Sequence, residues 1–112
     1  MPFLVIIKED SFIARLAARK LKTTSVAIVF GNTIYLWNVT KQQFLKNDRW
    51  VLHELEHIRQ YRKLGFLPFL FSYLYEWVRK GYYHNRFEVE ARQAEEKQKS
   101  FTDNEFFIAR DI

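Results

Sequence analysis

Five consecutive residues in the middle of the chain, His53-Glu54-Leu55-Glu56-His57, have the types and spacing of a metal site on a helix. Because an α-helix advances by about 3.6 residues per turn, residues four apart lie on one face, and both imidazoles can reach one ion. Glu54 is rotated to the side of that ion, where its carboxylate can accept a proton from a metal-bound water. The pattern predicts a Zn²⁺ site with ligands His53 and His57 and with Glu54 as the general base of a hydrolysis.

A third ligand must come from elsewhere in the chain. The sequence has no cysteine, so zinc can be held only by histidine nitrogen and carboxylate oxygen, the usual set of catalytic sites with three protein ligands and one open position. Glu88 and Glu90 lie near the start of a later predicted helix and point in different directions. Glu88 also fits a capping box with Asn85, and Glu90 also fits an ordinary exposed charge. The residue types alone leave both carboxylates open as the third ligand.

Length and composition indicate how many domains the chain has and which partners its charge favours. The chain has 112 residues, 48% of them hydrophobic and 18% aromatic, which predicts a single domain over residues 1–112, with 100–112 as a peripheral tail. The net charge of +5 comes from basic residues spread along the chain, which is typical of solvated helix faces. No nucleic-acid fold signature is present, so no nucleic-acid partner is predicted.

The apolar stretches do not predict a membrane span. The longest stretch, 66–78, is interrupted by Pro68, Ser72 and Glu76 and is too short to cross a bilayer. The first residues lack the basic lead-in and cleavage site of a signal peptide. We therefore expect a cytoplasmic protein without a transmembrane segment.

The order of predicted elements is strand, helix, hairpin and then three helices. Ser11 and Asn85 are suited to begin helices, Gly65 to end one, and Gly31-Asn32 to form a tight hairpin turn. The pattern predicts strands over 3–7, 26–30 and 33–37 and helices over 12–21, 41–64, about 68–81 and 86–99. We expect an α+β fold in which a small antiparallel sheet packs on the active-site helix and on further helices.

Two helices carry apolar residues that decide what they pack against. In the first helix one stripe is predicted to face the core: Phe12, Ile13, Leu16, Ala17 and Leu21. The aromatic residues of 66–78 surround most of their helix, and so small a domain cannot bury all of them. The remainder are expected to contact a protein partner, a membrane surface or a hydrophobic substrate.

The zinc motif, followed by Glu88-Val89-Glu90-Ala91 on a later helix, resembles the gluzincins, a family of zinc peptidases. The short length and the order of elements resemble the smallest members, the minigluzincins, and similar small metallopeptidase-like domains of bacteria, over roughly 26–96. The resemblance implies that Glu88, the first Glu of a Glu-x-x-Ala pattern, is the third ligand. Such proteins often have Asp four residues later to orient the first histidine, but here that position is Arg92. The residue that orients His53 is therefore not predicted.

The resemblance also implies a substrate, an extended peptide that pairs with an edge strand above the active-site helix. Carried over to this chain, that strand is 33–37, with either of its two faces toward the cleft. His84, Tyr82 and Tyr83 are candidate donors to the oxyanion, although packing or surface roles also fit them.

A second interpretation is a non-catalytic zinc module that binds a protein through exposed aromatics. The presence of Glu54 favours the enzyme, because a structural site needs no base. The apolar cluster Phe106-Phe107-Ile108 in the tail is interpreted as a packing strand or a disordered end, with docking into the cleft as the alternative.

Overall fold

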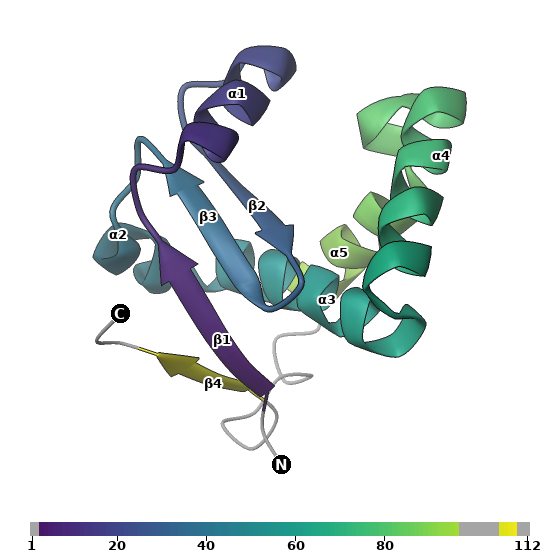
Figure 1. Ribbon diagram of the computed structural model, residues 1–112. Coiled ribbons are helices and arrows are strands. Elements are labelled where there is room, and N and C mark those ends of the chain that lie inside the picture. The colour runs from purple at the N-terminus through teal and green to yellow at the C-terminus, as the bar shows by residue number, and fades with distance from the viewer. Residues whose placement is uncertain (1–2, 97–105, 110–112) are drawn as a thin grey trace.

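The computed structural model describes residues 3–96 and 106–109, and Figure 1 shows their arrangement. The elements in chain order are β1 (Phe3–Lys8), α1 (Phe12–Leu21), β2 (Val26–Phe30), β3 (Thr33–Trp37), α2 (Lys41–Lys46), α3 (Asp48–Leu64), α4 (Phe66–His84), α5 (Arg86–Glu96) and β4 (Phe106–Ala109). None of the helices in these described ranges is long and apolar enough to cross a bilayer.

The α+β class is confirmed, but the sheet is mixed and the prediction of an antiparallel sheet is wrong. The described strands form one sheet in the order β2-β3-β1-β4. β2 and β3 are antiparallel across the Gly31-Asn32 turn, whereas β1 is parallel to both β3 and β4. The connection from β1 to β3 includes both α1 and β2, and a connection of this length allows two strands to pair in parallel.

The prediction that 33–37 is an edge strand is also wrong. β3 lies between β2 and β1, so both of its sides have strand neighbours. The free edge of the hairpin belongs to β2. Alternation of side chains gives the two faces of a strand but does not say which strand of a hairpin lies outermost.

The C-terminal cluster lies in a strand, as the preferred interpretation of the tail has it. β4 pairs with β1 in parallel from Phe3↔Phe106 to Ile6↔Ala109. Because β4 is at the opposite edge of the sheet from β2, which lines the cleft, the alternative of docking into the cleft is wrong for this segment. Most of the tail, 100–105 and 110–112, lies outside the described residues.

Helices cover both faces of the sheet (Figure 1). The main core lies between the sheet and α3 and includes Ile34, Leu36, Phe44 and Leu55. On the other face α1 packs through Ala14 and Ala18. The predicted stripe of α1 is therefore partly wrong: Ala17 and Leu21 pack on this cluster, but Phe12, Ile13 and Leu16 are exposed.

Caps explain where the helices begin and end. Ser11 accepts a hydrogen bond from the backbone N–H of Ala14, and Gly65, with a φ of 94°, ends α3, as predicted. The predicted helix over 41–64 is two helices, because Asn47 ends α2 and its side chain accepts from the backbone of Trp50 at the start of α3. α4 is broken at Gly81, where the backbone is non-helical at a φ of 80°, so the predicted end of this helix at about 81 coincides with the break.

Candidate metal centre

Helices α3 and α5 bring three potential ligands together. His53 and His57 project from adjacent turns of α3, and Glu88 projects from the first turn of α5. Glu88 Oε1 lies 2.9 Å from His53 Nε2, and Glu88 Oε2 lies 3.2 Å from His57 Nε2. One ligand atom from each of the three residues lies within 4.8 Å of the others. The predicted ligands His53, His57 and Glu88 therefore lie around one point.

The alternative ligand Glu90 lies apart from this point. Its side chain is exposed, and its Oε1 accepts a hydrogen bond of 3.0 Å from Gln60 Nε2. Two positions along α5 turn the side chain away from the histidines that Glu88 faces. Asn85 fixes this rotation: its Oδ1 accepts from the backbone of Phe87, and its Nδ2 donates to the carbonyl of Tyr73.

Each imidazole is held from behind by an acceptor. His53 Nδ1 lies 2.7 Å from Glu95 Oε2, and a carboxylate can only accept, so this Nδ1 carries a hydrogen. His57 Nδ1 lies 2.9 Å from Gln60 Oε1. The amide orientation follows from Gln60 Nε2, which donates to the carbonyl of Phe87 at 3.1 Å. Both rings therefore present Nε2 to the shared point, the arrangement that ligating histidines have in zinc sites.

The donor set fits zinc. It consists of two imidazole nitrogens and one carboxylate, without thiolate, as in catalytic sites that keep a fourth position for water or substrate. At bond lengths of about 2.0 to 2.2 Å, tetrahedral ligand atoms lie about 3.3 Å apart. The distances of 2.9 and 3.2 Å run from the two imidazoles to different oxygens of Glu88, and one ligand atom from each residue lies within 4.8 Å of the others, so the three groups are close enough to converge on one ion.

Glu95 is the partner of His53 that the sequence did not reveal. It lies seven residues after Glu88, two helical turns further along the same face of α5, which is a signal that a search at this spacing could find. Arg92, where the gluzincin pattern often has Asp, instead donates to the carbonyl of Tyr83 at 2.6 Å and lies over the Tyr83 ring. The contact to His53 thus comes one turn later.

The charges of this cluster support one another in the metal-free chain. Burial alone would raise the pKa of Glu88, but the positive charge of His57 and hydrogen bonds from both imidazoles hold it well below its usual range. Burial opposes protonation of His53, yet the hydrogen bond to Glu88 and the charges of Glu54 and Glu88 outweigh it and raise the pKa to about 9. The same balance raises the pKa of His57. Protons thus occupy the positions that a metal ion would take.

Glu54 is buried beside the same cluster. Its side chain is only 5% exposed, and burial raises its pKa to about 7, although the charges of both histidines oppose this. A base with a pKa near neutrality is suited to take a proton from water and later to release it. In the metal-free chain Glu54 is therefore a buried carboxyl group with a raised pKa, next to the three potential ligands.

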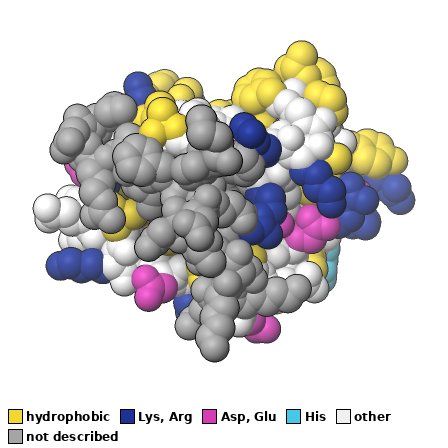
Figure 2. Space-filling view, turned by 90° about the horizontal axis from the view of Figure 1, so that it is seen from below, with side chains coloured by type: hydrophobic (Ala, Val, Ile, Leu, Met, Phe, Trp, Pro, Cys, Tyr) yellow, Lys and Arg dark blue, Asp and Glu magenta, His cyan; other side chains and the backbone are white. Residues whose placement is uncertain are grey.

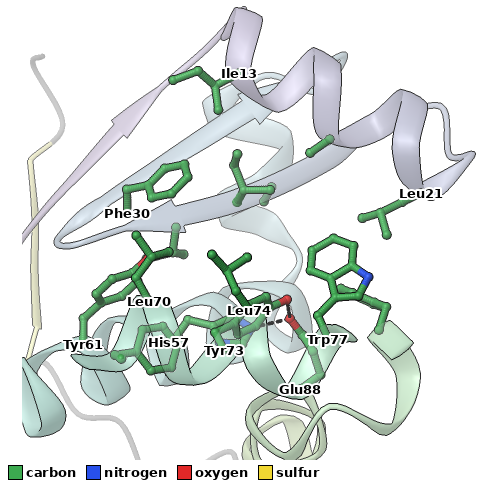
Figure 3. Close-up of a pocket in the computed structure, with 16 residues that line it drawn as sticks. Ile13, Leu21, Phe30, His57, Tyr61, Leu70, Tyr73, Leu74, Trp77 and Glu88 are labelled. Atoms are coloured by element: carbon green, nitrogen blue, oxygen red, sulfur yellow. Dashed lines mark hydrogen bonds and ion pairs between the residues drawn. The ribbon is translucent and has the colours of Figure 1, made fainter. Parts of the chain in front are cut away.

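An apolar cleft opens on the metal centre (Figure 3). Its volume is about 250 Å³. Ile13 and Leu21 of α1, together with the residues of β2 from Ala27 to Phe30, form one wall, and Leu70, Leu74 and Trp77 of α4 form the other. His57 and Glu88 line its inner end. A substrate in this cleft would reach the ligands from the side that the protein leaves open.

Two tyrosines line the cleft beside the ligands. Tyr73, which the sequence did not single out, donates its hydroxyl hydrogen to Glu88 Oε2. Tyr82 also lines the cleft, and burial and the charge of Glu88 raise the pKa of both hydroxyls, so both stay protonated donors. All three predicted oxyanion donors are exposed, and of them Tyr82 lines the cleft whereas Tyr83 and His84 do not.

Removing the carboxylate behind His53 should weaken the metal site without destroying it. In Glu95→Ala the imidazole loses its Nδ1 acceptor, and we expect zinc affinity to fall about 10- to 100-fold. Competition with a chromophoric chelator measures this affinity. Glu96→Ala is the control, because Glu96 is the exposed neighbour. Equal affinities of the Glu95→Ala variant and the unaltered chain would contradict the orienting role.

Stability of the metal-free chain should fall as the pH rises from about 6.5 to 9. The pKa of His53 is raised from 6.5 to about 9 in the folded state, so its contribution is complete below 6.5 and is lost as the pH passes 9. Burial raises the pKa of Glu54 from 4.5 to about 7, so the stability of the folded chain also falls as the pH rises through this range. Urea unfolding should show that the free energy of unfolding falls by up to about 3 kcal/mol between pH 6.5 and 9 because of the pKa shift of His53.

His53→Gln should flatten that pH profile, and His84→Gln, an exposed position, should leave it unchanged. Zinc binding should strengthen over the same pH range, because the metal competes with the imidazole protons. A metal-free chain whose stability is constant from pH 6.5 to 9 would contradict the charge balance described for His53.

Comparisons of the chain with protein-family models, with curated proteins and with solved structures each find no match. The likeness to gluzincins therefore stays a prediction from the motif. The structural observation that supports a functional proposal is the arrangement of His53, His57, Glu88 and Glu54 at the inner end of an apolar cleft.

Proposed function

We propose that this chain is a zinc-dependent peptidase. The observation that carries the proposal is the convergence of His53, His57 and Glu88 at the inner end of the cleft, with Glu54 buried beside them. A purely structural zinc site has four protein ligands and no opening. Here the described residues supply three ligands, and the open side faces a space large enough for part of a substrate.

The residues divide the chemistry among them. Bound zinc would supply Lewis acidity and lower the pKa of a coordinated water to about 7. Glu54 accepts the proton of the attacking water and passes it to the leaving amine. The hydroxyl of Tyr82, which stays protonated because its pKa is raised, donates to the oxyanion that forms on the carbonyl. Tyr73 and Glu95 hold Glu88 and His53 in place.

The substrate would be an extended peptide lying along β2. In an antiparallel ladder the backbone groups of every second residue point away from the partner strand. β2 has β3 on one side and the cleft on the other, so these groups are turned toward the space that leads to His57 and Glu88. A peptide added as a further strand there would bring its carbonyl groups past the metal centre.

Cleavage of peptides by the zinc-loaded full chain tests the proposal. We expect new amino termini, detected by mass spectrometry, in a mixture of fluorescence-quenched peptides. A chelator should stop the reaction, and zinc added back should restore it. Near-stoichiometric zinc binding without cleavage of any peptide would favour the non-catalytic zinc module, and absence of zinc binding would exclude both functions.

A further inference from the structure

The exposed apolar side chains are concentrated on the two helices that form the walls of the cleft. Among the described residues, thirteen large hydrophobic side chains are exposed, and all except Leu4 lie on α1 or within 64–83. Three of these twelve, Phe12, Ile13 and Leu16, are on α1. Small soluble domains seldom gather apolar surface in one region, and such a region usually marks an interaction site.

On α4 these residues form a continuous stripe. Leu67, Phe71, Leu74 and Val78 follow one another at spacings of four, three and four, which places them on one side of the helix. Phe71 is 65% exposed and Val78 is 86% exposed, whereas Phe69, on the opposite side, is buried against α3 and α5. The helix therefore has one apolar side that packs against the protein and a second apolar side that is exposed, of which Leu74 also lines the cleft.

The exposed charges on the same helices are all positive. On α1 they are Arg15, Arg19 and Lys20, and on α4 they are Arg79 and Lys80. The one acidic residue of the two helices, Glu76, is half-buried and pairs with Lys80 at 3.4 Å. Figure 2, a view from below, shows hydrophobic side chains on the right of the molecule together with Lys and Arg and with Asp or Glu side chains.

We propose that α1 and α4 dock on the surface of an anionic lipid membrane. Exposed Phe, Leu and Tyr side chains next to Lys and Arg are the composition of helices that lie in the interface of a bilayer. Phosphate and carboxylate headgroups match the positive charges, and the apolar side chains enter the boundary of the acyl chains. A second copy of the chain fits less well, because a symmetric contact through α1 would bring its three cations against themselves.

Vesicle flotation with the full chain tests this docking, with and without zinc. We expect binding to vesicles of phosphatidylcholine mixed with phosphatidylserine, weak binding to phosphatidylcholine alone, and release at high salt. Because the proposal does not involve the metal centre, binding should be the same in the metal-free and zinc-loaded chains. Its outcome is thus distinct from that of the peptidase test.

Variants on α1 and α4, each with a matched control, test whether these two helices form the surface that binds the vesicles. Arg15→Gln and Arg19→Gln should each weaken binding about fivefold, since one cation near the surface contributes about 1 kcal/mol. Lys46→Gln on α2 is the charge control. Phe71→Ser together with Val78→Ser should weaken binding at least about tenfold, and Leu4→Ser is the apolar control.

Two results would overturn the proposal. One is absence of binding to anionic vesicles. The other is a concentration-dependent dimer in light scattering that Phe71→Ser and Val78→Ser convert to monomer while vesicle binding is unaffected. All the variants are at exposed positions, and circular dichroism shows whether each one keeps its helices.

Discussion

The Glu88→Ala variant is expected to lose its zinc almost completely, whereas the zinc content of the Glu90→Ala variant should stay near one ion per chain. The two carboxylates are two residues apart on α5, but Glu88 lies between the two imidazoles and Glu90 bonds only to Gln60 among the described contacts of its side chain. Loss of one of three ligands should exceed the 10- to 100-fold effect typical of an outer partner. Metal analysis of the purified proteins and chelator competition measure both variants.

Glu88→Gln is the control for folding, because it keeps the shape of the side chain in a buried site. Its zinc affinity should also be far below that of the unaltered chain, since a neutral amide is a poor zinc ligand. A small decrease for Glu90→Ala is consistent with the site, because Gln60 connects Glu90 to His57. Zinc retained in Glu88→Ala but lost in Glu90→Ala would reverse the assignment of the ligand.

The second large effect is expected for Glu54→Gln, which should keep its zinc and lose about 10²- to 10⁴-fold in kcat/KM. The amide has nearly the same volume, so the buried site should keep its packing. It cannot accept the proton of the attacking water. The comparison needs metal content and peptide cleavage measured on the same preparation.

Glu56→Gln is the matched control for this variant, since it lies in the same motif two residues later and its carboxylate faces Arg59 at 3.5 Å. Its cleavage rate should stay close to that of the unaltered chain. If Glu54→Gln cleaved peptides at the full rate with zinc bound, the general base would be another residue.

The parts of the fold that depend on local chemistry could be predicted from the sequence. Ser11, Gly65 and Asn85 determine helix ends through side-chain capping or a positive φ, and each depends on residues within one turn. The motif at His53 and His57 is predictable for the same reason, because helical geometry alone places both rings on one face.

What could not be predicted depends on packing between distant segments. Tyr73 and Glu95 reach the ligands only because α4 and α5 fold against α3. The position of β3 inside the sheet depends on β1, which is far away in sequence. On α1, Phe12 and Leu16 are apolar enough for a core, but the small side chains of Ala14 and Ala18 bring the helix closer to the sheet.

The separation of the ligands along the chain gives zinc a second effect. The whole of α4 lies between His57 and Glu88 in the sequence. Phe69 is the only residue of this helix that is fully buried. In a chain without cysteine, an ion joining α3 to α5 would add its binding free energy to the stability of the folded state, in which it holds together the two helices that flank α4. Because α4 forms one wall of the cleft, a zinc ion bound at the inner end of the cleft would then hold both ends of this wall in place.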